Sequence, residues 1–287
     1  MRKAALWAPG LALLAAVFAL PLAEAVWTSL HQVWLQRPGE APFVGVENFA
    51  LLLASERFWA AVRHTGLFAV TSVALELTLG VGLALVMHRT RARGRALVRG
   101  AALVPWALPT VVAGLLWAWI LHDRHGVANH LLVSLAAIST PLVWLGEPAL
   151  AMSSIIGADV WKTTPFVALI ALAGLQSIDR GVYEAGGLDG ATGWRAFVHL
   201  TLPLLRPALL VALLFRTVDA VRVFDLVYVL TRGGPGGSTE TVSVLTYMIL
   251  FQELDVGRAS AAGLLTGAAA GAMALVYLRV LRWGGAS

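Results

Sequence analysis

The segment Tyr183-Glu184-Ala185-Gly186-Gly187-Leu188-Asp189-Gly190-Ala191-Thr192-Gly193-Trp194-Arg195 divides this sequence into two apolar parts. It is the centre of a polar, glycine-rich connection over about residues 175–207, which ends in Leu202-Pro203 and Pro207. The connection contains no Cys, no group of Ser, His and carboxylate residues, and no metal-ligand spacing. A polar island of this kind between apolar segments indicates contact with another protein rather than catalysis.

The composition on both sides of the island is that of a membrane protein. Of 287 residues, 59% are hydrophobic and 13% are charged, whereas soluble domains carry about 25% charged residues. The mean hydropathy is +0.78. We therefore expect an all-α polytopic protein in which residues 1–287 form a single transmembrane domain.

Two function classes are excluded or disfavoured by the residue inventory. The absence of cysteine excludes a disulfide framework, a thiol nucleophile and a Cys-based metal site. The pI of about 10.2 could indicate nucleic acid binding. The basic residues, however, lie at the ends of apolar segments, which is the pattern of membrane topology. No nucleic acid partner is expected.

Six apolar stretches predict six transmembrane helices, since about 20 residues cross the 30 Å hydrocarbon core. The first could instead be a signal peptide, because Ala23-Glu24-Ala25 resembles a cleavage site. Its length favours a retained helix. Pro105 and Pro109 predict a kink in the third stretch, and a short external helix is expected around Val127–Ala137. The spans cover about residues 5–28, 65–88, 100–121, 149–174, 208–230 and 259–281.

The distribution of basic residues predicts the orientation. Twelve of the 21 Lys and Arg residues lie at the two termini, in the 89–99 connection and in the polar island, and six lie in the longer connections opposite. Because cytoplasmic connections carry the excess of Lys and Arg, both termini and the island are predicted to be cytoplasmic.

The predicted fifth span carries Arg216, Asp219, Arg222 and Asp225, which are three residues apart and alternate in sign. At this spacing each Arg can pair with the next Asp on the same helix. Charges within a span usually face a bundle interior or a water-filled cavity. The row is therefore either the lining of a substrate path or partner interface, or a self-neutralising ladder.

Three further charges fall within predicted spans. Asp159 and Lys162 are three residues apart, which favours a local pair. Glu76 has no partner in its own helix and must find one elsewhere or be neutral. A proton relay through Glu76 is the alternative.

The glycine-rich run from Gly233 to Gly237 superficially resembles a phosphate-binding loop. It lacks the Lys that must follow the glycines. No Walker-type sequence occurs in the chain, so ATP-driven function would need an ATPase on another polypeptide.

Several motifs together resemble the permease subunits of binding-protein-dependent carbohydrate ABC importers. Glu184-Ala185-Gly186, Asp189-Gly190-Ala191 and Leu202-Pro203 are similar to that family's coupling loop, with Gly186 replacing an Ala and Asp179 replacing a frequent Pro. The resemblance extends through Trp161–Phe166, Leu172–Gln176 and Phe224–Thr231. Segments Leu85–Thr90 and Leu213–Ala220 are most similar to the trehalose- or maltose-type branch.

The resemblance implies a type I importer permease of a bacterial inner membrane. Such a chain is not an enzyme and binds no cofactor. It pairs with a second permease and two ATPase subunits, which hold ATP and magnesium, and receives sugar from an external binding protein. The residues implied in ATPase coupling are Glu184, Ala185, Gly186, Asp189, Gly190, Leu202 and Pro203. The residues predicted to line the substrate path are Glu76, Trp161, Arg216, Asp219, Arg222 and Asp225.

Three alternatives remain open at this point. An ion-coupled secondary transporter would show an internal repeat and unpaired mid-membrane carboxylates, and only Glu76 fits. An intramembrane enzyme would need a catalytic cluster, and no such cluster is apparent. An importer of glycerol phosphate or an oligosaccharide is the third. Arg216 and Arg222 each have an Asp within reach, which favours a neutral sugar over an anion.

Overall fold

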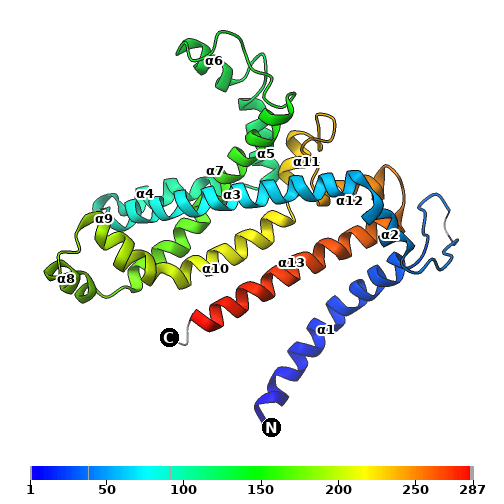
Figure 1. Cartoon of the computed structure of the whole chain (residues 1–287), viewed down its shortest axis with the longest axis horizontal. Coiled ribbons are helices and arrows are strands. Elements are labelled where there is room, and N and C mark those ends of the chain that lie inside the picture. The colour runs from blue at the N-terminus through cyan, green and yellow to red at the C-terminus, as the bar shows by residue number, and fades with distance from the viewer. Residues whose placement is uncertain (1, 38, 91, 285–287) are drawn as a thin grey trace. The chain divides into compact units, whose positions relative to one another are not determined.

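The computed structural model describes residues 2–37, 39–90 and 92–284, and the regular elements of this part are all helices (Figure 1). The expected all-α class is confirmed. Side chains are not described for residues 2–6, 8–9, 11–12, 92–96, 98 and 281–284, so Arg91 and most side chains of the arginine-rich 89–99 connection lie outside the described part.

The chain divides into two compact units. The first unit combines Met1–Val62 with Val242–Ala269, and the second combines Arg63–Thr241 with Ala270–Ser287. The long helices α3 (Glu56–Arg89) and α13 (Val256–Gly284) each contribute residues to both units.

The first unit contains α1 (Arg2–Ser29), α2 (Glu47–Ala54) and α12 (Val242–Phe251), with the parts of α3 and α13 that fall within its bounds. The connection after α1 is fixed by backbone hydrogen bonds, such as that from the Gln32 N–H to the Pro42 carbonyl (2.9 Å). An apolar core joins α2, α3, α12 and α13; its members include Leu52, Phe58, Leu245, Ile249 and Ala262.

The second unit is built around α7 (Pro148–Ser177), which packs against α4 (Ala92–Ala107) and α10 (Leu202–Val221). Its core joins α3, α7 and α10 through buried apolar residues: Val81, Ala84, Met87, Ala168, Ala171, Leu172, Leu175 and Leu205. Gly174 allows the close approach of α7 and α10, because a Cβ there would lie 2.7 Å from Leu205 Cδ1 and 2.8 Å from Ala208 Cβ.

Shorter elements lie at the two ends of α7 and α10 (Figure 1). At one end are α8 (Arg180–Leu188), α9 (Gly193–Ala196) and a π-helix, η1 (Phe197–Thr201), which runs directly into α10. Toward the other end are α5 (Thr110–Ile120) and α11 (Asp225–Leu230), which pack against each other. The expected external helix is α6 (Val127–Ser134); it ends before Ala136, whose φ of 54° is left-handed.

Within the part of the chain that the structure describes, four helices are long and apolar enough to cross a membrane: Glu56–Arg89, Pro148–Ser177, Gly193–Val221 and Val256–Val280. A fifth crossing is reached if the pair Arg99–Ala107 and Thr110–Ile120 counts as one broken span. Over the described residues α1 contributes only the shorter apolar helix Leu13–Ser29. The predicted six-span count is therefore not confirmed.

Two predicted spans differ from single continuous helices. The third, in which Pro105 and Pro109 predicted a kink, is broken at Leu108-Pro109, and its two halves are bent by 96°. Pro109 is extended, with a ψ of 139°, and stands immediately before α5. Because the first N–H groups of a helix have no partner within the helix, the missing N–H of proline leaves no hydrogen bond unmade there. The fifth ends at Val221 and restarts at Asp225. The hydroxyl of Thr241 donates to the Val223 carbonyl at this break (3.0 Å), so that carbonyl stays satisfied.

Candidate functional site

Arg216 of α10 is the centre of a buried charge cluster that links three helices. Its Nε lies 2.5 Å from Glu76 Oε2 on α3, and its Nη2 lies 2.9 Å from Glu76 Oε1 and 3.0 Å from Asp159 Oδ2 on α7. Its Nη1 donates to Asp219 on α10. Glu76 is fully buried and Arg216 is 3% exposed. The planar guanidinium can serve several carboxylates at once, which a Lys ammonium cannot do in this geometry.

The Thr163 hydroxyl completes the cluster. Its Oγ1 lies 2.6 Å from Glu76 Oε1 and 2.6 Å from the Asp159 carbonyl oxygen, one turn back on α7. Ion pairs in a low-dielectric interior are costly to assemble, yet removing one partner costs more because a buried charge is left uncompensated. The cluster therefore fixes the mutual placement of α3, α7 and α10.

The cluster confirms some of the predicted pairings and overturns others. Arg216 pairs with Asp219, as the helical spacing predicted, and Glu76 has its partner on another helix. The predicted Asp159–Lys162 pair is wrong, because Asp159 is directed to Arg216. The Arg222–Asp225 pair is also wrong. Arg222 caps α10 and Asp225 begins α11, so the two no longer share a helical face.

A polar pocket of about 210 Å³ lies beside the cluster. Its charged lining residues are Asp159, Lys162, Arg216, Asp219, Arg222 and Asp225. Among the described residues, Lys162, Arg222 and Asp225 make no ion pair, so their charged ends are available to a bound molecule. The break between α10 and α11 creates this site, since it brings Arg222 and Asp225 to the same cavity.

Four of the six residues predicted to line the substrate path line this pocket, and two do not. Glu76 lies behind Arg216, and Trp161 packs against Trp117 with the ring centroids 5.8 Å apart. Sequence reasoning missed Thr163, Phe68 and Phe224 as neighbours of the pocket. Thr163 could have been found, since it follows Asp159 by four residues and therefore lies on the same helical face.

The predicted coupling segment forms a short helix, α8, whose start is explained by Asp179. The Asp179 Oδ1 accepts a hydrogen bond from the Gly181 N–H at 2.6 Å, which is a typical N-cap. Glu184, Ala185 and Asp189 are exposed. Gly190, with a φ of +80°, makes the turn that follows.

Gly186 has a packing role that its sequence position alone did not reveal. It is buried, and a Cβ at this residue would lie 2.5 Å from Leu200 Cδ1. Gly186 therefore stands where the resembled family has Ala, and Leu200 occupies the space that the alanine methyl group would need. By contrast, Leu188 is 92% exposed and Trp194 is 75% exposed, so this end of the unit presents large apolar side chains.

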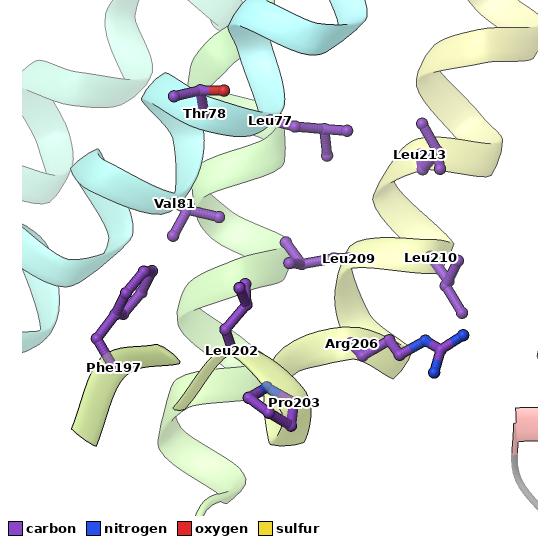
Figure 2. A pocket seen from close by; sticks show the side chains of 10 residues that line it. All are labelled: Leu77, Thr78, Val81, Phe197, Leu202, Pro203, Arg206, Leu209, Leu210 and Leu213. Atoms are coloured by element: carbon purple, nitrogen blue, oxygen red, sulfur yellow. The ribbon is translucent and has the colours of Figure 1, made fainter. Parts of the chain in front are cut away.

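A second, apolar pocket of about 560 Å³ lies where the coupling segment meets α10 (Figure 2). Leu77 and Val81 of α3 line it on one side, and Leu202, Pro203 and Leu209 of α10 line it on the other. Pro203 lies where η1 passes into α10, and because it has no N–H it cannot donate to a carbonyl of the preceding turn. Leu202 and Pro203 thus shape the join between the segment and the span.

Comparison with known proteins agrees with this architecture. Residues 77–283 match the family described as binding-protein-dependent transport system inner membrane component. The crystal structure of a bacterial ABC transporter involved in the import of the acidic polysaccharide alginate has the same fold. It superimposes with a TM-score of 0.82 at 23% identity, over 98% of this chain and 96% of the other.

Curated relatives match over almost the whole chain. The trehalose/maltose transport system permease protein MalF of Thermococcus litoralis is 43% identical over 264 residues, which is 92% of this chain and 88% of the relative. The trehalose permease SugA of Mycobacterium tuberculosis is 38% identical, covering 95% and 86%. The sulfoquinovosyl glycerol permease SmoG of Agrobacterium fabrum is 38% identical, covering 96% and 89%. The chain belongs to the family of inner membrane permease components of binding-protein-dependent ABC transport systems.

Proposed function

We propose that this chain is the permease subunit of an ATP-driven importer that moves a neutral disaccharide of the trehalose or maltose type into the cytoplasm. The observation that carries the proposal is the charge-balanced polar pocket beside the buried cluster. Relatives named for trehalose and maltose transport, at 38–43% identity, support the choice of cargo.

The pocket suits a polyhydroxyl compound without net charge. Its lining holds three carboxylates and three cationic groups, so formal charges cancel, and Glu76 behind Arg216 adds one more negative charge. The cationic groups can donate hydrogen bonds to sugar hydroxyls, and the carboxylates can accept hydrogen bonds from them. The sequence argument for a neutral cargo relied on an Arg222–Asp225 pair that does not form; the balance of the whole lining supports that cargo instead.

An acidic sugar is the second candidate cargo. Lys162 and Arg222 line the pocket without an ion pair among the described residues. One relative carries the name of a sulfoquinovosyl glycerol permease. Either cation could meet a sulfonate or carboxylate, so this candidate has a specific basis in the pocket.

The proposed assembly contains a second permease, two ATPase subunits that hold ATP and magnesium, and an external sugar-binding protein. The docking face is the outer side of α8, with Glu184, Ala185 and Asp189 exposed and Leu188 projecting at its end. Gly190 turns the chain back, and Leu202 and Pro203 begin the span. In this proposal the chain supplies no catalytic group for ATP hydrolysis.

The first test is purification of the chain from its native membrane in mild detergent, followed by reconstitution of the recovered complex in liposomes. Recovery of an ATPase and a second permease, with trehalose- or maltose-loaded binding protein stimulating ATP hydrolysis, is expected. Stimulation only by sulfonated or carboxylated sugars would transfer the proposal to the acidic cargo. Transport that follows an ion gradient, without an ATPase, would contradict the importer.

Glu184→Lys tests the docking face. We expect loss of sugar-stimulated ATP hydrolysis, because the substitution reverses a charge on the exposed side of α8. Glu40→Lys is the matched control, since Glu40 is also exposed and lies in a connection predicted to be external. Intact assembly and hydrolysis in Glu184→Lys would refute the role of Glu184.

A further inference from the structure

The inner face of α8 is attached to η1 through two adjacent residues of the π-helix. The Tyr183 hydroxyl lies 3.1 Å from Thr201 Oγ1. Three residues further along α8, Gly186 meets Leu200, whose Cδ1 would lie 2.5 Å from an added Cβ. Because residues three apart share a helical face, both contacts lie on the same side of α8, while Glu184 and Ala185 are exposed.

The direction of the hydroxyl pair follows from counting protons. Thr201 Oγ1 also lies 3.4 Å from the Ala196 carbonyl, where it can only donate. A threonine hydroxyl has one proton. When Thr201 donates to Ala196, Tyr183 must therefore donate to Thr201. The result is a short relay from the side chain of α8 to the backbone at the start of η1, and Thr201 is only 5% exposed.

The π-helix places this contact at the base of a span. The Leu202 N–H bonds to the Phe197 carbonyl, five residues back, and η1 continues into α10 without a break. Single-turn π-helices are rare and are frequent at functional positions. Helix α10 then runs for 20 residues, about 30 Å at 1.5 Å per residue, and carries Arg216 and Asp219 to the polar pocket. One continuous element thus joins the α8 contact to the charge cluster.

We propose that Tyr183 is a positioning residue: through the Thr201 hydroxyl it transmits movement of α8 to α10, and η1 is the joint. This inference rests on the proposed function, since it requires an ATPase to displace α8. Tyr183 lies on the inner face and touches neither the docking face nor the pocket. Its removal should separate ATP hydrolysis from transport without preventing assembly.

The experiment uses the reconstituted complex and the ratio of sugar transported to ATP hydrolysed. Tyr183→Phe and Thr201→Val each remove one hydroxyl at nearly constant volume. We expect the ratio to fall about fivefold, the factor that corresponds to one hydrogen bond of about 1 kcal/mol. The double variant should fall no further than Thr201→Val alone, because that substitution already removes the Tyr183–Thr201 hydrogen bond.

The chain supplies a matched control. Thr217 of α10 and Tyr277 of α13 form the same kind of hydroxyl pair, at 3.2 Å, away from α8. Tyr277→Phe should keep the wild-type ratio. Thr201→Ser retains the hydroxyl and should keep most of the coupling. It also serves as the folded reference if Thr201→Val assembles poorly.

The outcomes separate the two proposals. Wild-type coupling in Tyr183→Phe, or equal coupling in Thr201→Val and Thr201→Ser, overturns the role of Tyr183. A loss in Tyr277→Phe equal to that in Tyr183→Phe also overturns it, because the effect would then follow from any lost hydroxyl pair on α10. A wild-type complex without sugar-stimulated ATP hydrolysis refutes the proposed function itself.

Discussion

At the scale of single residues, Arg216 determines the character of the site. One guanidinium meets carboxylates from α3, α7 and α10, and the Glu76 side chain opposite it is fully buried. Neither carboxylate on the other helices could have been assigned from local spacing, since Glu76 is 140 residues away and Asp159 is 57 residues away. For Glu76 the sequence predicted only that the carboxyl group must find a partner outside its own helix or be neutral.

Arg216→Ala should destabilise the protein by about 3–5 kcal/mol, because Glu76 and Asp159 remain buried without a counter-charge. Thermal unfolding of the purified chain in detergent measures the effect. Arg222→Ala is the control, since Arg222 makes no ion pair among the described residues, and we expect a much smaller shift. Equal shifts in the two variants would contradict the structural role of the cluster.

Two neighbouring glycines of α8 should respond differently to alanine. At Gly187 an added Cβ meets nothing within 4 Å, so Gly187→Ala should stabilise the helix by up to about 1 kcal/mol. At Gly186 the same gain is opposed by contact with Leu200. Amide hydrogen exchange of α8 reports the difference. Equal protection in both variants would show that Leu200 moves aside freely and does not hold α8.

At the scale of elements, the breaks in α4–α5 and α10–α11 matter most. Composition identified both stretches as apolar, but it could not locate their ends. Prolines at 105 and 109 suggested a kink, and the actual bend of 96° depends on what α5 packs against. Gly114 of α5 sits against Val229 of α11, where a Cβ would lie 2.9 Å from Val229 Cγ1. The two broken spans therefore stabilise each other.

Gly114→Leu should disrupt this contact and destabilise the protein by about 1–3 kcal/mol, the usual cost of overpacking. Val229→Ala should recover part of the loss by making room. Gly82→Ala is the control, because a Cβ at Gly82 on α3 meets nothing within 4 Å. Unfolding midpoints in detergent provide the measurement. An unaffected Gly114→Leu variant would mean that α5 and α11 do not depend on each other.

At the scale of the whole molecule, the predicted topology is open to a direct test. The chain has no cysteine, so a single introduced Cys is a unique reporter. Leu188→Cys and Leu135→Cys place a thiol at residues that are 92% and 75% exposed. A membrane-impermeant maleimide should label the first only in inside-out vesicles stripped of peripheral proteins, and the second only in right-side-out vesicles.

Labelling of both residues from the same side would contradict the predicted orientation. Labelling of Leu188→Cys only in right-side-out vesicles would also remove α8 from the face on which an ATPase could act. The orientation itself follows from the bias of Lys and Arg residues, which reflects how connections are retained in the cytoplasm during insertion.

The sequence by itself determined the helical membrane class, the apolar stretches and the family, because these depend on composition and on local motifs such as Glu184-Ala185-Gly186. It also located the polar segment that forms α8. Tertiary structure alone decided which charges meet, where the third and fifth stretches break, and why glycine stands at 186. Each of these depends on atoms contributed by distant parts of the chain. A buried charge or a close helix contact is satisfied by whichever partner the packing brings near, and local periodicity carries no information about that partner.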